Sequence, residues 1–260
     1  MVVADRPAAP GGPRHNRKRS GGTLTMTAGP DPEDETDHRV RVARMRRERM
    51  RDRLLQSVLA ICSATPAGSR PSIESVIAHA DVSKATFYKY FASVDEAVGT
   101  LGAEMVDEMV ANLITLLGDK PDEPLVAMST SIHLFLMRSV TEPLWADFVA
   151  RSDALGGDSE ARHGLEMHIG DSFRAGLVRI VNYEAAVALA IGALMEGMRH
   201  IARHPERPNR PFVEGLLAQI LIGLGVETPA ARRLVDESAA FIRAAAPERL
   251  TWWRDPWGAA

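Results

Sequence analysis

The stretch "SIESVIAHADVSKATFYKYF", residues 72–91, carries the strongest structural signal in the sequence. Ser72 precedes eight residues whose apolar positions fall at helical spacing, and Ser83 precedes a second short segment that ends at Phe91. Serine is a favoured N-cap, because its hydroxyl accepts hydrogen bonds from the open amides of the first turn. About three residues remain between the two segments, so the stretch predicts two helices joined as in a helix-turn-helix.

The second segment, predicted as a helix over 84–91, combines an apolar face with many polar side chains. Phe87 and Phe91 lie close together at helical spacing and form the face that packs on the core. Lysine offers charged donors, and threonine and tyrosine offer neutral ones, which suit phosphate oxygens and base-edge acceptors. An ordinary amphipathic surface helix is an equally good interpretation of this segment alone. The side chains outside the apolar face are Lys84, Ala85, Thr86, Tyr88, Lys89 and Tyr90.

The longer stretch "SIESVIAHADVSKATFYKYFASVDEAV" resembles the DNA-binding signature of TetR-family repressors. The shared features are the apolar helix, the Val-Ser exit from the turn and the Lys-x-Thr-aromatic-Tyr-x-x-Phe recognition segment. The resemblance covers residues 40–100. Asp81 and Ala85 stand where the family often has glycine, and Val94 stands where it often has lysine. Aspartate tolerates the left-handed backbone that the turn requires.

This resemblance implies an all-α fold with an N-terminal helix-turn-helix DNA-binding domain and a larger helical ligand-binding and dimerisation domain. Two recognition helices of a homodimer would enter successive major grooves of a partly palindromic operator, about 34 Å apart. By resemblance, Ser83, Thr86 and Tyr88 contact phosphates, whereas Lys84, Lys89 and Tyr90 lie nearest the bases. The complete set implied at the DNA is Ser72, Ser83, Lys84, Ala85, Thr86, Tyr88, Lys89, Tyr90, Arg44 and Arg47.

The distribution of charge agrees with this organisation. Residues 39–91 hold 11 basic and 4 acidic residues, whereas residues 92–260 hold 15 basic and 24 acidic residues. A basic block before an acidic body is typical of a DNA-binding module joined to a module that does not bind DNA. The whole chain carries a net charge of only -3, which argues neither way.

The arginine-rich segment 39–64 predicts the first long helix. In its first half Arg44, Arg46, Arg47 and Arg51 could reach the DNA backbone or minor groove, as N-terminal extensions of this helix do in TetR-family proteins. A solvated charged helix face, supported by ion pairs to acidic residues four positions away, is the alternative.

Ser93 and Glu96 form a capping box, which predicts a long helix from residue 94. By resemblance, this helix connects the effector domain to the DNA-binding domain. The later segments show helical periodicity and no strand alternation. The predicted organisation is a disordered tail over 1–38, the helix-turn-helix domain over 39–92, the helical domain over 93–250 and a C-terminal tail over 251–260.

Two segments near the C-terminus bear on assembly. A stripe of alanines and Gly197 runs along 183–204 beside a stripe of large apolar residues, and 211–225 is apolar almost all round. Helices that are apolar on more than one side need a second surface to pack against, so these segments predict a homodimer with a four-helix interface. A core within one chain is the alternative.

The helical domain is expected to hold a pocket for a small apolar effector, whose identity the sequence does not give. Methionine and aromatic side chains adapt to apolar ligands, although each of them can equally belong to the core. The candidates for the lining are Met105, Phe135, Trp145, Phe148, Met167 and Phe173.

Other classes of function have weaker signals. "GDSF" at 170–173 is similar to a lipase block, but it falls within a helix pattern, and "GDSE" at 157–160 has the same weakness. His200 and His204 are spaced by four on one helix and could hold a metal if a third ligand converged, but a charged surface pair near the helix end, beside Arg199 and Arg203, is the favoured interpretation. No catalysis, cofactor or metal is expected.

A single cysteine, Cys62, and no apolar run of about 18 residues favour a reducing cytoplasm, at the nucleoid, without membrane contact. The prediction is a ligand-responsive dimeric transcriptional regulator, which the resemblance implies to be a repressor that an effector releases from its operator. An architectural DNA-binding protein without effector control is the alternative.

Overall fold

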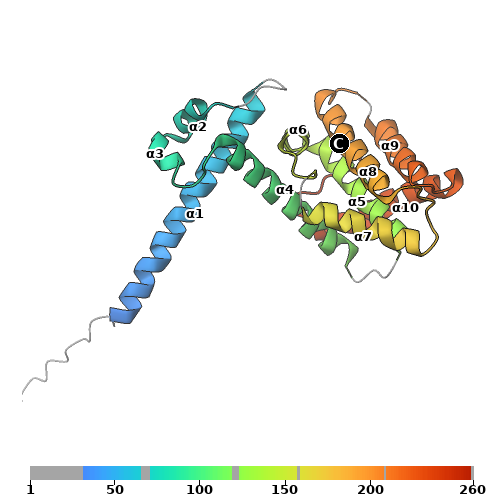
Figure 1. Ribbon diagram of the computed structural model, residues 1–260, viewed down its shortest axis with the longest axis horizontal. Coiled ribbons are helices and arrows are strands. Elements are labelled where there is room, and N and C mark those ends of the chain that lie inside the picture. The colour runs from blue at the N-terminus through green and yellow to red at the C-terminus, as the bar shows by residue number, and fades with distance from the viewer. Residues whose placement is uncertain (1–31, 66–70, 119–122, 157–158, 208, 259–260) are drawn as a thin grey trace, which may run out of the picture. The chain divides into compact units, whose positions relative to one another are not determined.

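The computed structural model describes residues 32–65, 71–118, 123–156, 159–207 and 209–258. Within these ranges every regular element is a helix (Figure 1). The chain divides into two units, 1–47 and 48–260, which are described separately. The predicted all-α fold is therefore confirmed for the described residues.

Helix α1 spans Pro32–Ala64 and begins seven residues before the predicted start at residue 39. The prediction of disorder is thus wrong for 32–38, whereas residues 1–31 lie outside the described residues. The sequence of this stretch offers a reason, because proline is favoured in the first turn of a helix and acidic residues there complement the helix dipole. The prediction of disorder rests on the lack of large apolar residues in this segment, but the end of a helix does not need such residues.

The helix-turn-helix consists of α2, Ile73–Ala80, and α3, Lys84–Phe87. Both predicted serine caps are confirmed: the Ser72 hydroxyl accepts from the Ser75 amide and the Ser83 hydroxyl accepts from the Thr86 amide. Asp81 adopts the left-handed conformation, with φ 50° and ψ 54°, as the turn requires.

The α-helical part of the recognition segment is shorter than the predicted helix over 84–91. After Phe87 the backbone continues in turns, in which the Lys89 amide donates to the Thr86 carbonyl and the Tyr90 amide to the Phe87 carbonyl. The Phe91 amide donates to the Phe87 carbonyl at 3.1 Å, so the two phenylalanines keep their helical spacing.

Helix α4, Val94–Leu117, starts at the predicted N-cap, since the Ser93 hydroxyl accepts from the Glu96 amide at 3.0 Å. The return bond differs from a standard capping box, because the Glu96 carboxylate accepts from the amide of Ala92 rather than from that of Ser93.

Two apolar clusters form the core. The smaller cluster joins α1, α2, α3 and the first turn of α4, and it also takes up Phe148 from α6. The larger cluster fills the helical body. The buried members of the smaller cluster are Leu54, Leu55, Val58, Cys62, Val76, Ala80, Phe87, Phe91, Ala97 and Phe148.

In the body, α5 is the central helix and packs against α7, α8, α9 and α10 (Figure 1). Its residues from Met128 to Ser139 are buried with the exception of Ser131. Helix α5 is buried on nearly every side because other helices cover it, and its buried side chains include the polar residues Thr130, His133 and Arg138. The body helices are α5 Pro124–Thr141, α6 Pro143–Ser152, α7 Glu160–Arg174, α8 Tyr183–Arg203, α9 Asn209–Gly223 and α10 Thr228–Arg249.

The C-terminal segment packs on the body through tryptophans. The Arg138 guanidinium lies 4.6 Å from the ring centres of both Trp145 and Trp252, and it pairs with Glu108 and Glu142 at 3.2 Å. A cation held between two aromatic faces and two carboxylates fixes the segment after α10 to α5 and α6.

Helix α8 is long and apolar enough, by length and composition, to cross a membrane, and no other described helix is. It packs against α5, α6, α7 and α9, which makes it a helix of the body's core.

Candidate functional site

The recognition segment rests on a rigid aromatic anchor. Phe87 is fully buried and Phe91 is 4% exposed, and their ring centres lie 5.8 Å apart. At the start of the segment the hydroxyls of Ser83 and Thr86 lie 2.9 Å apart, and the Thr86 amide donates to the Ser83 hydroxyl at 3.1 Å. The backbone of this segment is therefore held from both the inside and the N-terminal end.

Most polar side chains of the segment point away from this anchor. Tyr88 is 51% exposed, and Lys84 and Lys89 are exposed as well. Tyr90 differs, because its ring is half-buried and packs against the smaller cluster. Tyr90 thus has less freedom to reach a base than its helical position alone suggests.

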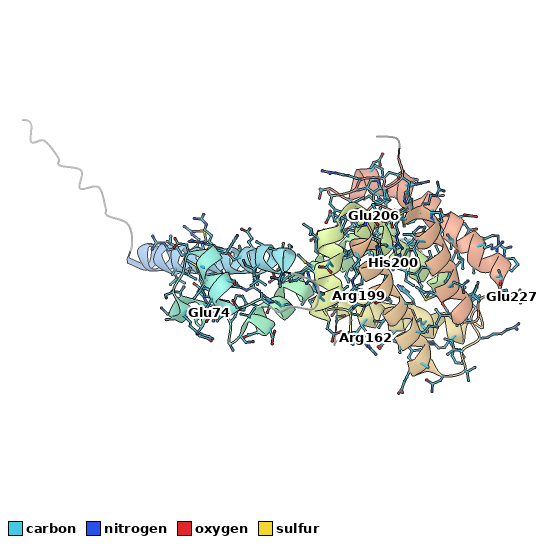
Figure 2. The ribbon with its side chains drawn as sticks, turned by 90° about the horizontal axis from the view of Figure 1, so that it is seen from above. Glu74, Arg162, Arg199, His200, Glu206 and Glu227 are labelled. Carbon is cyan, nitrogen blue, oxygen red and sulfur yellow. The ribbon has the colours of Figure 1, made fainter. Side chains whose placement is uncertain are left out.

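A carboxylate lies beside the recognition segment. The Lys84 ammonium is 3.4 Å from Glu74 Oε1, which projects from the first turn of α2 (Figure 2). A hydrogen bond from its own backbone amide and then the bond from Lys84 lower the pKa of Glu74. Glu74 therefore stays ionised at neutral pH and competes with any other anion for Lys84.

The remaining residues implied at the DNA are also placed on surfaces. Ser72 is exposed at the start of α2, and Ala85 is exposed within α3. Arg44 and Arg47 are exposed on α1, in the unit that ends at residue 47 and is described by itself. The residues implied at the DNA that belong to α2 and α3 therefore lie together on the helix-turn-helix.

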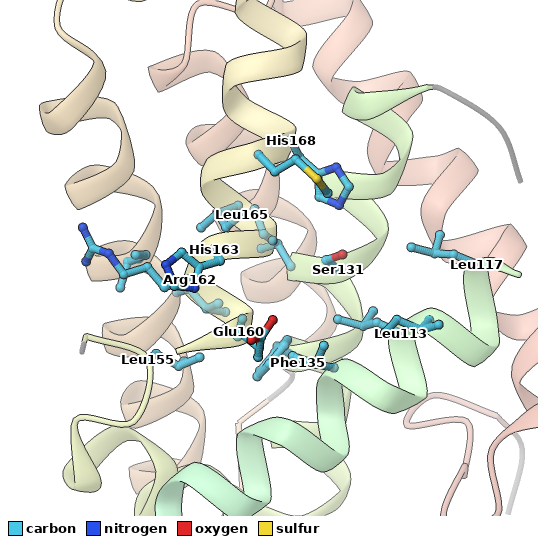
Figure 3. Close-up of a pocket in the computed structure, with 18 residues that line it drawn as sticks. Leu113, Leu117, Ser131, Phe135, Leu155, Glu160, Arg162, His163, Leu165 and His168 are labelled. Atoms are coloured by element: carbon cyan, nitrogen blue, oxygen red, sulfur yellow. The ribbon is translucent and has the colours of Figure 1, made fainter. Parts of the chain in front are cut away.

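A cavity of about 490 Å³ lies in the body between α4, α5, α7 and α8. Its wall is mostly aliphatic, with contributions from Leu113, Ile132, Leu155, Ile191 and others (Figure 3). This size and composition are typical of a site for a small, largely apolar molecule.

Five polar residues also line this cavity: Ser131, Glu160, Arg162, His163 and His168. The Ser131 hydroxyl donates to the Ala127 carbonyl at 2.8 Å and keeps its lone pairs for another partner. Figure 3 places Ser131 between Leu117 and His163, with His168 toward one end of the cavity and Glu160 toward the other.

Among the polar residues of the lining, Arg162 is in an ion pair and His168 is a neutral imidazole. Arg162 Nε donates to Glu166 Oε1 at 2.8 Å, so this guanidinium is already paired. Burial lowers the pKa of His168, and the nearby Asp171 only partly opposes this effect. His168 is thus a neutral imidazole at pH 7, able to donate one hydrogen bond and accept another.

The predicted pocket residues are only partly brought together. Phe135 and Met167 line the cavity. Trp145 is buried beneath Arg138, and Met105 packs between the two apolar clusters. Phe148 belongs to the smaller cluster, and Phe173 is 51% exposed on α7. Residue type alone did not separate core, surface and cavity, since all six are large and apolar.

The polar lining residues were missed, although the sequence of α7 holds a signal. Gly164 lies four residues after Glu160, and Met167 and His168 lie three and four residues after Gly164, so all four share a face of α7. Leu165 and Ile169 occupy the buried face beside it. A second, partly polar stripe next to a core stripe indicates a helix that faces a hollow.

The two lipase-like motifs and the histidine pair have structural roles in the helical body. Ser172 of "GDSF" is fully buried within α7, unlike an exposed nucleophile, and Ser159 of "GDSE" is the N-cap of α7. His200 stacks on Phe212 at 4.3 Å between ring centres and lies 4.9 Å from His204. The described residues contain no group of three or more potential metal ligands.

Comparison with solved structures places this arrangement among known folds. RolR in complex with resorcinol matches 74% of this chain and 95% of its own, with a TM-score of 0.53 and 18% identity. RolR without ligand matches with a TM-score of 0.54 and 17% identity, over 71% of this chain and 95% of its own. A gamma-butyrolactone receptor, an ArpA-like protein, matches 76% of this chain and 98% of its own, with a TM-score of 0.51 and 14% identity.

The chain shares the fold of RolR and of the gamma-butyrolactone receptor. No protein-family model and no curated protein matches the sequence. At 14–18% identity the likeness shows the fold alone, and the all-α fold with a helix-turn-helix that the sequence predicts is thus confirmed.

Proposed function

We propose that this protein is a ligand-responsive transcriptional regulator of the TetR family, which represses transcription as a dimer on a partly palindromic operator. The observation that carries the proposal is the recognition segment, which presents exposed lysines, hydroxyls and Tyr88 from a buried aromatic anchor. Phosphate contacts fix the position of such a motif, and contacts to base edges give it sequence preference.

The structure supports DNA contact by a rigid segment. Burial of Phe87 and Phe91 and the cap at Ser83 hold the backbone, so the main chain that carries Lys84 and Lys89 loses little conformational entropy on binding. We propose that Ser83, Lys84, Thr86, Tyr88 and Lys89 carry most of the contacts. Tyr90 would contribute mainly through packing.

Helix α4 offers a physical route from effector to DNA. Its first part buries Ala97 in the smaller cluster, and its last part lines the cavity with Leu113. Midway, α4 approaches α6 so closely that a methyl group at Gly102 would overlap the Ser152 hydroxyl. A ligand that shifts the end of α4 therefore biases the recognition segments of the two protomers, and release follows if the ligand binds one arrangement better.

The exposed face of α8 and α9 supports a homodimer. Only 44% of the apolar stretch of α8 is buried within one chain, and Leu189 is 45% exposed. Apart from the adjacent residues and the backbone of the same helix, no described atom lies within 4 Å of the position that a Cβ would take at Gly192 of α8 or Gly215 of α9. We propose that these helices pair with those of a second copy, which places two recognition segments on one duplex.

A cytoplasmic location and the absence of catalysis belong to the same proposal. Both neighbours are named for binding rather than for a reaction, RolR for resorcinol and the other as a receptor. An architectural DNA-binding protein without effector control would not need a cavity of about 490 Å³ beside α4.

Selection of fragmented genomic DNA by the purified protein tests the proposal. The native protein is expected to enrich fragments that share a partly palindromic motif, and the K84A/K89A variant is expected to lose this enrichment. Equal recovery of all fragments by the native protein would refute sequence-specific regulation.

A further inference from the structure

The ligand cavity continues into a second hollow. This outer hollow has a volume of about 740 Å³ and shares four wall residues with the cavity: Ile114, Leu117, Met167 and His168. Shared walls make the two hollows adjoining chambers, with His168 at their junction.

The order of wall residues along α7 and α5 shows that the chambers form one elongated site. Along α7 the wall passes from Glu160 in the inner chamber through His168 to Asp171 and Ala175 in the outer one. On α5, which runs in the opposite direction along the site, it passes from Phe135 back to Pro124. Eleven residues of helix span about 16 Å at 1.5 Å per residue, so the site suits a ligand longer than a single ring.

The two chambers differ in charge. The inner chamber is aliphatic apart from the five polar residues named above, of which Arg162 is paired with Glu166. The outer chamber holds two carboxylates, Glu123 and Asp171, and no basic residue among its described lining. Arg174 pairs with Asp171 from the same helix, but the Arg174 side chain is 73% exposed. Among the described residues no cation forms an ion pair with Glu123.

These observations define what kind of polar group the outer chamber accepts. A carboxylate or phosphate placed there would meet like charge, whereas an ammonium or hydroxyl group would donate hydrogen bonds to Glu123, Asp171 or His168. The apolar part of the same molecule would displace water from the aliphatic inner chamber.

We infer that the effector is an elongated amphiphile with an apolar body in the inner chamber and a hydrogen-bond-donating head, an amine or alcohol, in the outer chamber. Amphiphiles with an anionic head bind more weakly there, because the head meets two carboxylates. This inference rests on the proposed function in calling the ligand an effector, but binding itself is measured without DNA.

Three probes with the same eight-carbon chain test the inference: octylamine, 1-octanol and octanoate. Isothermal titration calorimetry on the full-length protein measures their dissociation constants at one ionic strength. Octylamine is expected to bind at least about tenfold more tightly than octanoate, with octanol between them, because the charge term changes sign between the two ionic heads. In the E123Q/D171N variant the ratio of amine to carboxylate affinity is expected to fall to about threefold or less.

The E227Q variant is the matched control, because Glu227 is an exposed carboxylate, paired with Arg179, that lines neither chamber. It should keep the full preference for octylamine. Equal or tighter binding of octanoate, no binding of any probe, or an amine preference that E123Q/D171N leaves intact would overturn the inference. Amine binding without any operator preference would instead refute the proposed function and leave the binding site standing.

Discussion

Neutralising Glu74 should strengthen DNA binding. The Glu74 carboxylate holds the Lys84 ammonium at 3.4 Å, and both side chains are largely exposed, 70% and 54%. Because the pKa of Glu74 is lowered, its charge is present throughout the neutral range. In the E74Q variant Lys84 is free to neutralise a phosphate.

The magnitude follows from counterion release. Each phosphate neutralised changes the slope of log association constant against log salt by about 0.9, so two freed lysines per dimer steepen it by about 1.8. If E74Q and the native protein bind DNA equally well at about 1 M salt, this difference in slope makes E74Q bind at most about 60-fold more tightly at about 0.1 M salt. A gain of affinity cannot result from partial unfolding, which makes the direction informative.

Fluorescence anisotropy with a labelled operator duplex, from 0.05 to about 0.3 M salt, measures the slope directly. The K84A variant should bind more weakly, and adding E74Q to K84A should bring little further gain, because the freed partner is gone. The E227Q variant removes an equally exposed paired carboxylate from the body, so its slope should equal that of the native protein.

An E74Q variant that binds no more tightly, with an unchanged slope, would refute the orientation of α2 and α3 toward DNA. A gain that persists in the K84A background would show that Glu74 repels DNA directly and that its pairing with Lys84 is irrelevant.

Three further predictions concern the body. Burial and the nearby Arg243 lower the pKa of His133 to about 4. As pH falls below 6.5, His133 binds a proton in the unfolded state before it does in the folded state. The free energy of unfolding should therefore drop by about 3 kcal/mol between pH 6.5 and 4. Denaturant titrations of the H133Q variant should lack this part of the pH dependence. Replacing the 7% exposed Arg138 side chain by methionine should cost about 2–4 kcal/mol in denaturant unfolding, because two cation–π contacts are lost, and a cost near zero would contradict their role. The G192R variant should be a monomer by light scattering at concentrations where the native protein is a dimer, and an unchanged mass would place the interface elsewhere.

Local chemistry made the N-terminal motif predictable. The cap at Ser83, the left-handed backbone of Asp81 and the burial of Phe87 follow from interactions within a few residues, so the sequence contains what determines them. The early start of α1 at Pro32 escaped because disorder was inferred from composition rather than from helix-start signals.

The cavity was harder to predict because it depends on packing between distant helices. Phe135 and Trp145 are both large and buried, with ring centres 6.0 Å apart, yet only Phe135 lines the hollow. Periodicity along one helix identifies its buried face. Which side chains of that face line a cavity depends on the neighbouring helices. Phe148 shows the same limit, since it lies on α6 but packs in the smaller cluster.

The most direct test of the central claim is the affinity of the purified protein for the DNA upstream of its own gene, compared with scrambled DNA of equal length and composition across a salt series. We expect a preference of about a thousandfold or more for a site within the upstream DNA, with one or two dimers bound. Equal affinity for both duplexes, with the same steep salt dependence, would leave only a basic surface and contradict the assignment of a sequence-specific regulator.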